Sequence, residues 1–467
     1  MLEIKIIYNF TLIILWGMSK IFKIKLKWLI PFFILVILGL VSVFWKTKLP
    51  KVENFGNMTD IVGADVAWLL TSSCLVLLMT PGLSFFYGGM VGKKNVISTM
   101  LQSFVALGVI ALVWVVVGFS LSFGSPLGFT IDGKHFGVIG NPLDYMFFDQ
   151  VNALPHLDMA GTIPFVLFAL FQMKFAVITP AIITGSFAER VRFIAYLFFI
   201  VLFSLFIYTP LCHMIWHPSG LLGAYFGIKD FAGGTVVHMS AGFAALAGAM
   251  YLGKRKQQHH EPTNIPFVLL GTGMLWFGWF GFNAGSALAA NSSAAIAFAT
   301  TTIASAMAMM TWIFLDKIKG RKISALGACI GAVVGLVAIT PAAGFVSVAE
   351  SIFFGFITAV VSNYFMHWEK LKKIDDTLDV FACHGVGGIM GMILTAIFAN
   401  VEGASLLHGG GWPLLFSHLL VLVGVAAFSF FGSLLLYKVV GLFITFRVSE
   451  ENEEKGLDIT QHNEKYT

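Results

Sequence analysis

Two histidines inside long apolar stretches are the residues best suited to chemistry. His238 ends the run Asp-Phe-Ala-Gly-Gly-Thr-Val-Val-His that begins at Asp230. On a helix, which rises about 1.5 Å per residue, it would lie about 12 Å from that aspartate. His384 follows Asp379 in Asp-Val-Phe-Ala-Cys-His-Gly, about 8 Å along its own helix. An imidazole titrates near neutral pH, so this pair could pass protons.

Other interpretations of the two histidines stay open at this point. They could be unrelated side chains that are hydrogen-bonded in a packed core, or they could ligate a metal or a haem. Haem sites in helical bundles usually need several placed histidines, and no second pair appears. We therefore expect no metal and no cofactor. Because an ionisable group is costly to bury in a membrane and usually serves function there, we favour a shared role for His238 and His384.

A carboxylate precedes each histidine. Asp230 stands at the predicted start of its helix, where a carboxylate caps the first turn and complements the helix dipole. The same fixed charge would also favour a cation near that end of the helix. Asp379 has the mirror position before His384, and capping is its simpler explanation.

Aromatic side chains form a second group of residues that could bind a small molecule or ion. Trp216 ends an apolar segment, and the run Gly-Trp-Phe-Gly-Phe-Asn-Ala-Gly-Ser brings Phe282 and Ser286 to the same side. A tryptophan face beside a serine hydroxyl suits a small cation, through cation–π attraction and hydrogen bonding. Trp216 would also fit the belt of tryptophans at a membrane surface. Phe171 and Phe175 share one face of another predicted helix, where plain packing is the simpler explanation.

The composition shows what must position these residues. Of 467 residues, 58% are hydrophobic and 11% are charged, and the mean hydropathy is +0.86. Soluble domains carry about 25% charged residues, so a water-exposed globule of this size is excluded. Segments such as 103–121 are apolar on nearly every side, unlike the alternating strands of a membrane β-barrel. The chain is predicted to be an all-α polytopic membrane protein, and nothing in it supports nucleic-acid binding.

Apolar segments long enough for a membrane crossing, which takes about 20 residues, recur eleven times. The predicted transmembrane helices are 64–90, 99–124, 161–187, 193–216, 233–252, 265–286, 293–315, 324–340, 347–368, 379–399 and 414–447.

The loops test this count and orient the chain. Fourteen basic residues fall in alternate loops, and the opposite set holds only Lys134 and Lys229. Basic residues concentrate in cytoplasmic loops, so the first span should begin outside and the C-terminus should be cytoplasmic. We expect a multi-pass protein of the inner (plasma) membrane. The fourteen are Lys93, Lys94, Arg190, Arg192, Lys254, Arg255, Lys256, Lys317, Lys319, Arg321, Lys322, Lys370, Lys372 and Lys373.

Three regions follow from this pattern. Residues 1–60 form a leader and a short outer segment, residues 61–447 the membrane domain, and residues 448–467 a cytoplasmic tail. The leader has the layout of a signal peptide or an anchor helix, and either would deliver the first span to the outside. Cleavage, or a start at Met18, stays open. Spans one to five and six to ten would form an inverted repeat that brings one histidine from each half to the centre.

The motifs make the chain resemble the ammonium transporter/methylammonium permease/Rhesus family, on its bacterial ammonium-transporter branch. The resemblance runs from about residue 65 to residue 458 and covers all eleven predicted spans. The matching segments are Pro81–Gly89, Asp230–His238, Gly278–Ser286, Asp379–Gly385 and the tail Phe446–Asp458.

The resemblance implies roles for eight of the residues above. Four would form or organise an outer ammonium site: Trp216, Ser286, Phe171 and Asp230. Two rings would form the family's stacked phenylalanine gate: Phe175 and Phe282. The last two would be the twin histidines of the pore: His238 and His384.

Partners are also implied by the resemblance. It implies a homotrimer with one pore per subunit, and a trimeric PII-type nitrogen signal protein that docks on the cytoplasmic face. Lys174 departs from the family pattern, which looks uncharged at that position beside the gate. Snorkelling or a structural ion pair explains it most simply.

Physical chemistry explains why these parts suit ammonium. A dry pore imposes a charge-burial penalty of several kcal/mol on any ion. Ammonium can avoid the penalty by losing a proton and crossing as ammonia, whereas potassium cannot. We expect the histidine pair to relay that proton. The alternatives are an ammonium sensor of the same fold and a Rhesus-type neutral-gas channel, although that branch tends to lack the cation site that Trp216 suggests.

Overall fold

The computed structural model describes residues 26–45, 54–257, 261–401 and 403–467. The chain divides into two compact units, residues 1–50 and 51–467. The described part of the first unit is one apolar helix, α2 (Leu26–Phe44), with Pro31 inside it. Residues 1–25 and 46–53 of the predicted leader, with the alternative start at Met18, lie outside the described residues.

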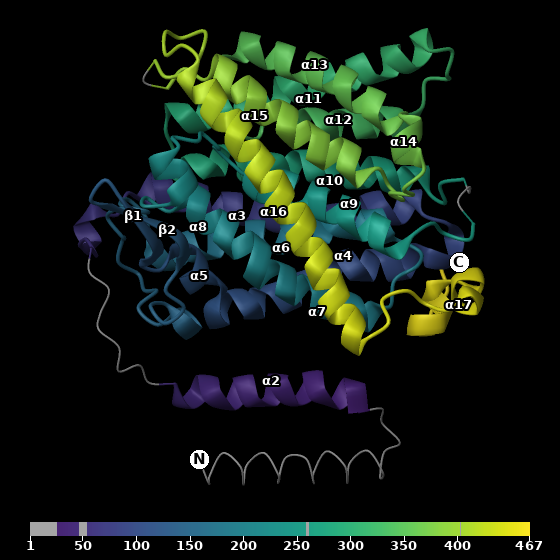
Figure 1. Cartoon of the computed structure of the whole chain (residues 1–467). Helices are drawn as coiled ribbons and strands as arrows, with labels where there is room; N and C mark the ends of the chain where they lie inside the picture. The colour runs from purple at the N-terminus through teal and green to yellow at the C-terminus, as the bar shows by residue number, and fades with distance from the viewer. Residues whose placement is uncertain (1–25, 46–53, 258–260, 402) are drawn as a thin grey trace. The chain divides into compact units, whose positions relative to one another are not determined.

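The second unit is a bundle of apolar helices (Figure 1). Within the described residues, ten helices are long and apolar enough to cross a membrane, which confirms the predicted all-α polytopic class. Several of them contain a short 3-10 or π turn. Their α-helical parts are α3 (Gly63–Met90), α4 (Val96–Val113) with α5 (Phe119–Phe123), α6 (Phe165–Ile183), α7 (Phe193–Phe203) with α8 (Thr209–Trp216), α9 (Ser240–Leu252), α10 (Ile265–Ala284), α11 (Ser292–Ile318), α13 (Val348–Met366), α15 (Gly387–Phe398) and α16 (Pro413–Phe443).

The eighth predicted span, 324–340, coincides with a helix that is shorter than the ten long apolar helices. α12 (Ala325–Ile339) has 15 residues, a length of about 22 Å. It begins where the Ser324 hydroxyl accepts a hydrogen bond from the Gly327 amide at 3.0 Å. Most of its side chains are buried, and it packs against α10, α11, α13 and α15. Ten full-length helices and one short, enclosed helix therefore occupy the eleven predicted places.

A β-hairpin that was not predicted joins α5 to the segment before α6. Strands β1 (Pro126–Ile131) and β2 (Lys134–Gly140) are antiparallel, with Ile131 opposite Lys134. The two residues between them, Asp132 and Gly133, have φ angles of 50° and 77°. Asp-Gly with positive φ at both positions is the usual two-residue hairpin turn. The pattern was missed because it is short and lies between long apolar spans.

His238 and His384 lie in matching local structures. His238 is in the π-helical turn η8 (Gly234–Met239), which continues as α9. His384 is in the π-helical turn η10 (Phe381–Val386), which continues as α15. Such turns inside helices are frequent at functional sites. The backbones cross closely, because a Cβ atom on Gly242 would lie only 2.2 Å from the Gly385 nitrogen.

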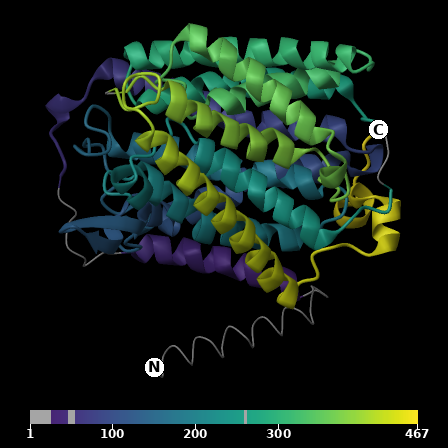
Figure 2. The ribbon, with the colours of Figure 1, turned by 45° about the horizontal axis from the view of Figure 1, so that its top comes forward.

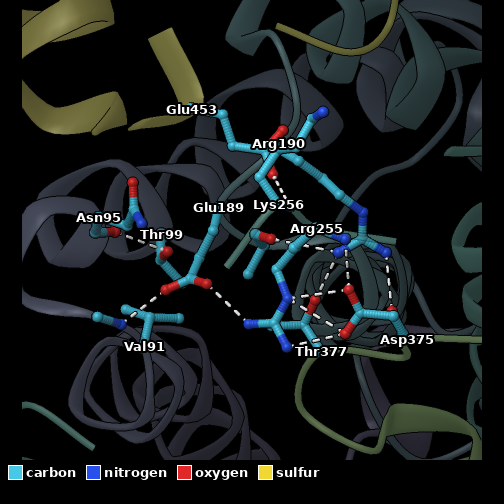
Figure 3. A network of polar contacts seen from close by, with 12 residues as sticks. Val91, Asn95, Thr99, Glu189, Arg190, Arg255, Lys256, Asp375, Thr377 and Glu453 are labelled. Atoms are coloured by element: carbon cyan, nitrogen blue, oxygen red, sulfur yellow. Dashed lines mark hydrogen bonds and ion pairs between the residues drawn. The ribbon is translucent and has the colours of Figure 1, made fainter. Parts of the chain in front are cut away.

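Loops from separate helix junctions meet at one end of the bundle around buried Arg255 (Figure 3). Its guanidinium pairs with Glu189 at 2.7 Å and with Asp375 at 2.8 Å. Burial alone would raise the pKa of Asp375, but hydrogen bonds from Arg255 outweigh it and hold the pKa below its ordinary value. The neighbouring Arg190 donates to the Thr377 hydroxyl at 2.6 Å. We call this end, which carries these loops, the basic end.

The C-terminal segment docks on the basic end. Helix α17 (Glu450–Lys455) places Glu453 against Arg447, with 2.8 Å between the charged atoms, and against the amide of Lys256 at 2.7 Å. The carboxylate of Asp458 accepts the Ser98 amide at 2.7 Å. Helix α16, which precedes this segment, crosses the bundle obliquely in both views (Figures 1 and 2). The tail is thus a folded part of the bundle.

Candidate functional site

A cavity of about 150 Å³ opens between the ends of α6, α8 and α10, and we call it the aromatic cavity. Trp216, Ser286 and Phe175 line it, as the aromatic and hydroxyl motifs predict, together with Asp158 and Gln172. Its wall therefore combines aromatic faces with oxygen atoms. Such a lining can hold a small cation by cation–π attraction and hydrogen bonds.

Hydrogen bonds fix the two predicted contact groups in the aromatic cavity. The indole nitrogen of Trp216 donates to the carbonyl oxygen of Asp230 at 3.0 Å. The Ser286 hydroxyl donates to the carbonyl oxygen of Phe282 at 2.8 Å. Because the serine proton is used in this bond, its oxygen lone pairs remain free to accept a hydrogen bond from a cation.

Asp230 organises the start of the helix that carries His238. One carboxylate oxygen accepts the amides of Gly233 at 2.8 Å and Gly234 at 2.7 Å. The other accepts the amide of Thr235 at 2.8 Å and the Thr235 hydroxyl. The side chain is buried, so it caps the helix N-terminus and offsets the dipole there.

Phe175, which lines the aromatic cavity, lies against the ring of Phe282. Phe175 and Phe282 are buried, with ring centroids 4.2 Å apart and planes 33° apart. Phe175 also meets Trp216 edge to face at 5.8 Å. Phe171 packs against Phe175 at 5.0 Å but is not among the described residues that line the cavity. It therefore contacts the ring of Phe175 without lining the cavity.

The histidine pair lies directly beyond the phenylalanine pair. The Phe282 and His238 ring centroids are 5.9 Å apart, and the Nδ1 atoms of His238 and His384 are 3.3 Å apart. Both rings are buried and line a cavity of about 10 Å³ with Trp279 and Ile178. That volume is about enough for one water.

The contact between two Nδ1 atoms constrains the protons. If both nitrogens carried a proton they would repel, and if neither did there would be no hydrogen bond. A bonded neutral pair therefore has one ring protonated at Nδ1 and the other at Nε2. The Nε2 atom of His238 is buried without a hydrogen-bond partner among the described residues.

Lys174 lies off this path. Its side chain is partly buried and makes no hydrogen bond or ion pair with any described residue. It does not line the aromatic cavity or the small cavity at the histidines. The charge that departs from the family pattern therefore lies on α6, the helix that carries Phe175, without lining either cavity.

Two polar residues of the aromatic cavity escaped the sequence analysis. Asp158 belongs to the loop before α6, where no helical spacing relates it to the other residues. Gln172 follows Phe171 directly, and its Oε1 atom is buried without a partner among the described residues. A polar side chain between two aromatic positions of an apolar span was the available signal. Within the described part of the chain, no group of three or more His, Cys, Asp or Glu could hold a metal ion.

Comparisons with known proteins place the chain in a family. The profile of the Ammonium Transporter Family matches residues 67–467. An ammonium transporter of Aquifex aeolicus is 42% identical over 441 residues, which are 93% of this chain and 98% of that protein. The crystal structure of Candida albicans Mep2 matches with a TM-score of 0.75 and 33% identity, over 84% of this chain and 88% of that one.

A solved sensor Amt protein is also similar, with a TM-score of 0.76 and 30% identity over 85% of this chain and 98% of that one. The profile covers most of the chain, and the Aquifex aeolicus relative is matched over nearly its whole length. The chain therefore belongs to the ammonium transporter family.

Proposed function

We propose that this protein transports ammonium across the inner (plasma) membrane, recruiting it in the aromatic cavity and passing it on as ammonia. One observation carries the proposal, a continuous series of ring contacts. It runs from Trp216 to Phe175, from Phe175 to Phe282, and from Phe282 to His238. A recruitment site, a closed gate and a proton-handling pair thus follow one another along one route.

Recruitment would take place at Trp216 and Ser286. The indole face attracts the ammonium charge, and the serine oxygen accepts one N–H bond. Asp230 contributes indirectly, because its carbonyl oxygen holds the indole in place. Phe171 would act as a support for the ring of Phe175.

Deprotonation would occur at the phenylalanine pair. Ammonium loses one proton and becomes ammonia, which can pass the apolar rings without the several kcal/mol that burying a charge costs. The released proton would pass to an imidazole nitrogen of the pair formed by His238 and His384. The hydrogen bond between the two Nδ1 atoms then reverses its direction. The histidine on the far side of the pair returns a proton to the ammonia. Charge and substrate thus cross by separate steps.

Orientation, assembly and regulation belong to the same proposal. The basic end would face the cytoplasm, because basic loops concentrate there, and the leader 1–60 would lie before the membrane domain 61–447. The tail 448–467 would then be cytoplasmic. The family resemblance supports a homotrimer and a PII-type partner on the cytoplasmic face.

A sensor of the same fold is the second candidate, favoured by the similarity to the sensor Amt protein. A Rhesus-type gas channel is less consistent with the cation-binding groups of the aromatic cavity. Currents on a solid-supported membrane test all three. Purified protein in proteoliposomes should give a transient current with ammonium and none with potassium. A sensor without transport, or a channel for neutral ammonia, would give no ammonium current, and that result would reject the proposal.

A further inference from the structure

Asp158 brings a charge to the aromatic cavity. Among the described residues that line this cavity, it alone carries a formal charge, and its side chain is exposed to solvent. It shares the cavity wall with Trp216 and Ser286. An ion that enters the cavity therefore meets a carboxylate on the same wall as the aromatic face.

The chain before the first core span holds Asp158 in position. The side-chain amide of Asn54 donates to the Asp158 carboxylate at 2.8 Å, and the amide of Leu157 donates to the carbonyl oxygen of Asn54 at 2.9 Å. Phe55 anchors this contact by packing on His156, with ring centroids 5.4 Å apart. Two segments about a hundred residues apart in sequence thus fix the carboxylate at the cavity.

The other aspartate of the region cannot supply the same attraction. The carboxylate of Asp230 accepts bonds from three backbone amides and one hydroxyl, and it is buried at a helix N-terminus. Those donors offset its charge locally. Asp158 has one side-chain hydrogen bond, from the neutral amide of Asn54, so its negative charge remains available to an approaching cation.

The imidazoles of His156 and His217, which lie near Asp158, do not neutralise its negative charge at neutral pH. Burial, followed by the nearby His156, lowers the pKa of His217 to about 4. Burial also lowers the pKa of His156, although Asp158 opposes that shift. Both rings are therefore neutral near pH 7, and the carboxylate stands as a net negative charge beside the tryptophan.

We propose that Asp158 is a cation-recruiting residue, which concentrates ammonium at the mouth of the aromatic cavity and hands it to Trp216 and Ser286. The inference rests on the proposed transport of ammonium and adds a specific electrostatic step to it. A carboxylate in a narrow mouth raises the local cation concentration and the association rate, and salt weakens the effect. It takes no proton and needs no conformational change.

Substitution Asp158→Asn tests the inference, because it keeps the shape and the Asn54 contact while removing the charge. Ammonium-evoked currents in proteoliposomes should show an apparent KM about 3- to 10-fold higher, with the maximal current within about twofold of wild type. Raising the ionic strength with an impermeant salt should raise the KM of wild type and leave that of D158N nearly constant.

The matched control is Asp132→Asn. Asp132 is exposed in the hairpin turn of the segment between α5 and α6, which also contains Asp158. Its positive φ suits asparagine equally well. D132N should behave as wild type. A D158N protein that transports with the KM and salt dependence of D132N would overturn the inference and leave the proposed function intact. Wild-type protein without any ammonium current would instead overturn the proposed function and this inference with it.

Discussion

The Nδ1 atoms of His238 and His384 lie 3.3 Å apart although the two residues are 146 positions apart in the chain. Each comes from a π-helical turn, and the two turns belong to helices that cross at Gly242 and Gly385. A bulky residue at the crossing would separate the rings. The close approach of the two backbones thus brings the two Nδ1 atoms within hydrogen-bond distance.

Removing either imidazole should stop proton transfer. We expect His238→Ala and His384→Ala each to reduce the ammonium current at least tenfold, because the remaining ring has no partner for its Nδ1 atom. Currents on a solid-supported membrane measure this. Replacing the buried His418 is not a suitable control, since its Nδ1 bonds the Met392 carbonyl oxygen. An unchanged current in both alanine variants would contradict the relay.

If Phe175 and Phe282 form a gate, removing one of the two rings should allow potassium to pass. Phe282→Ala removes one of two rings that lie 4.2 Å apart, and with it part of the lining of the small cavity at the histidines. Water would then reach the pore and lower the cost of an ion there. We expect a potassium current that wild type lacks, measured in the same proteoliposome assay.

Phe280→Ala provides the matched control for this gate. Phe280 lies on the same helix but stacks on Phe298, at 4.0 Å, and lines neither cavity. The F280A protein should remain selective for ammonium. Equal potassium currents in F280A and F282A would indicate general loosening of the bundle instead of an opened gate.

The sequence predicted the long helices better than the loops between them. Among the described residues, hydropathy located the long apolar helices because apolar length is a local property. Basic residues mark the loops that meet around Arg255. The bounds of α12 were predicted to within one residue, and its cap Ser324 stands at the predicted start. The hairpin of β1 and β2 was missed, because its Asp-Gly turn is a short pattern between long apolar spans. Asp158 was missed for a different reason. A loop residue held by Asn54 reaches the cavity through tertiary contacts, which no periodic pattern records.

We expect Asp230 to stabilise the folded protein as well as to organise the ammonium site. Asp230→Asn replaces one acceptor oxygen with an amide that faces backbone N–H groups already bonded to the carboxylate. The NH2 group of asparagine and these backbone N–H groups are all donors, so they cannot form hydrogen bonds with one another. We therefore expect the free energy of unfolding to fall by about 1–3 kcal/mol. Thermal unfolding in detergent should show a lower Tm. A variant with wild-type Tm and impaired transport would assign Asp230 to ammonium binding alone.

The buried charges at the basic end predict a second stability effect. Arg255→Met leaves Glu189 and Asp375 buried without their partner, and breaking a buried ion pair in this way costs about 3–5 kcal/mol. We expect a lower Tm and faster proteolysis of the tail, because Lys256 and Arg447 next to this cluster hold Glu453. The exposed pair of Lys455 and Glu451 serves as control. Lys455→Ala should leave Tm unchanged.

The raised pKa of Asp376 should make the stability of the protein depend on pH. Its carboxylate accepts the Phe381 amide at 2.7 Å, but burial, the largest influence, raises its pKa to about 6. The unfolded chain releases this proton near pH 4. Between about pH 4 and pH 6 the folded protein thus binds more protons, so this group makes the free energy of unfolding fall as pH rises, with no further change above pH 6.

Asp376→Asn isolates that contribution, because the amide oxygen can still accept the Phe381 N–H and carries no charge. The difference in Tm between D376N and wild type, measured in detergent, should increase from pH 4 to pH 6 in favour of the variant and then stay constant to pH 8. Asp375 acts in the opposite sense, since its pKa is lowered and its stabilisation is lost only in stronger acid. A Tm difference that is independent of pH would show that the Asp376 carboxyl is already ionised at pH 4 in the folded protein.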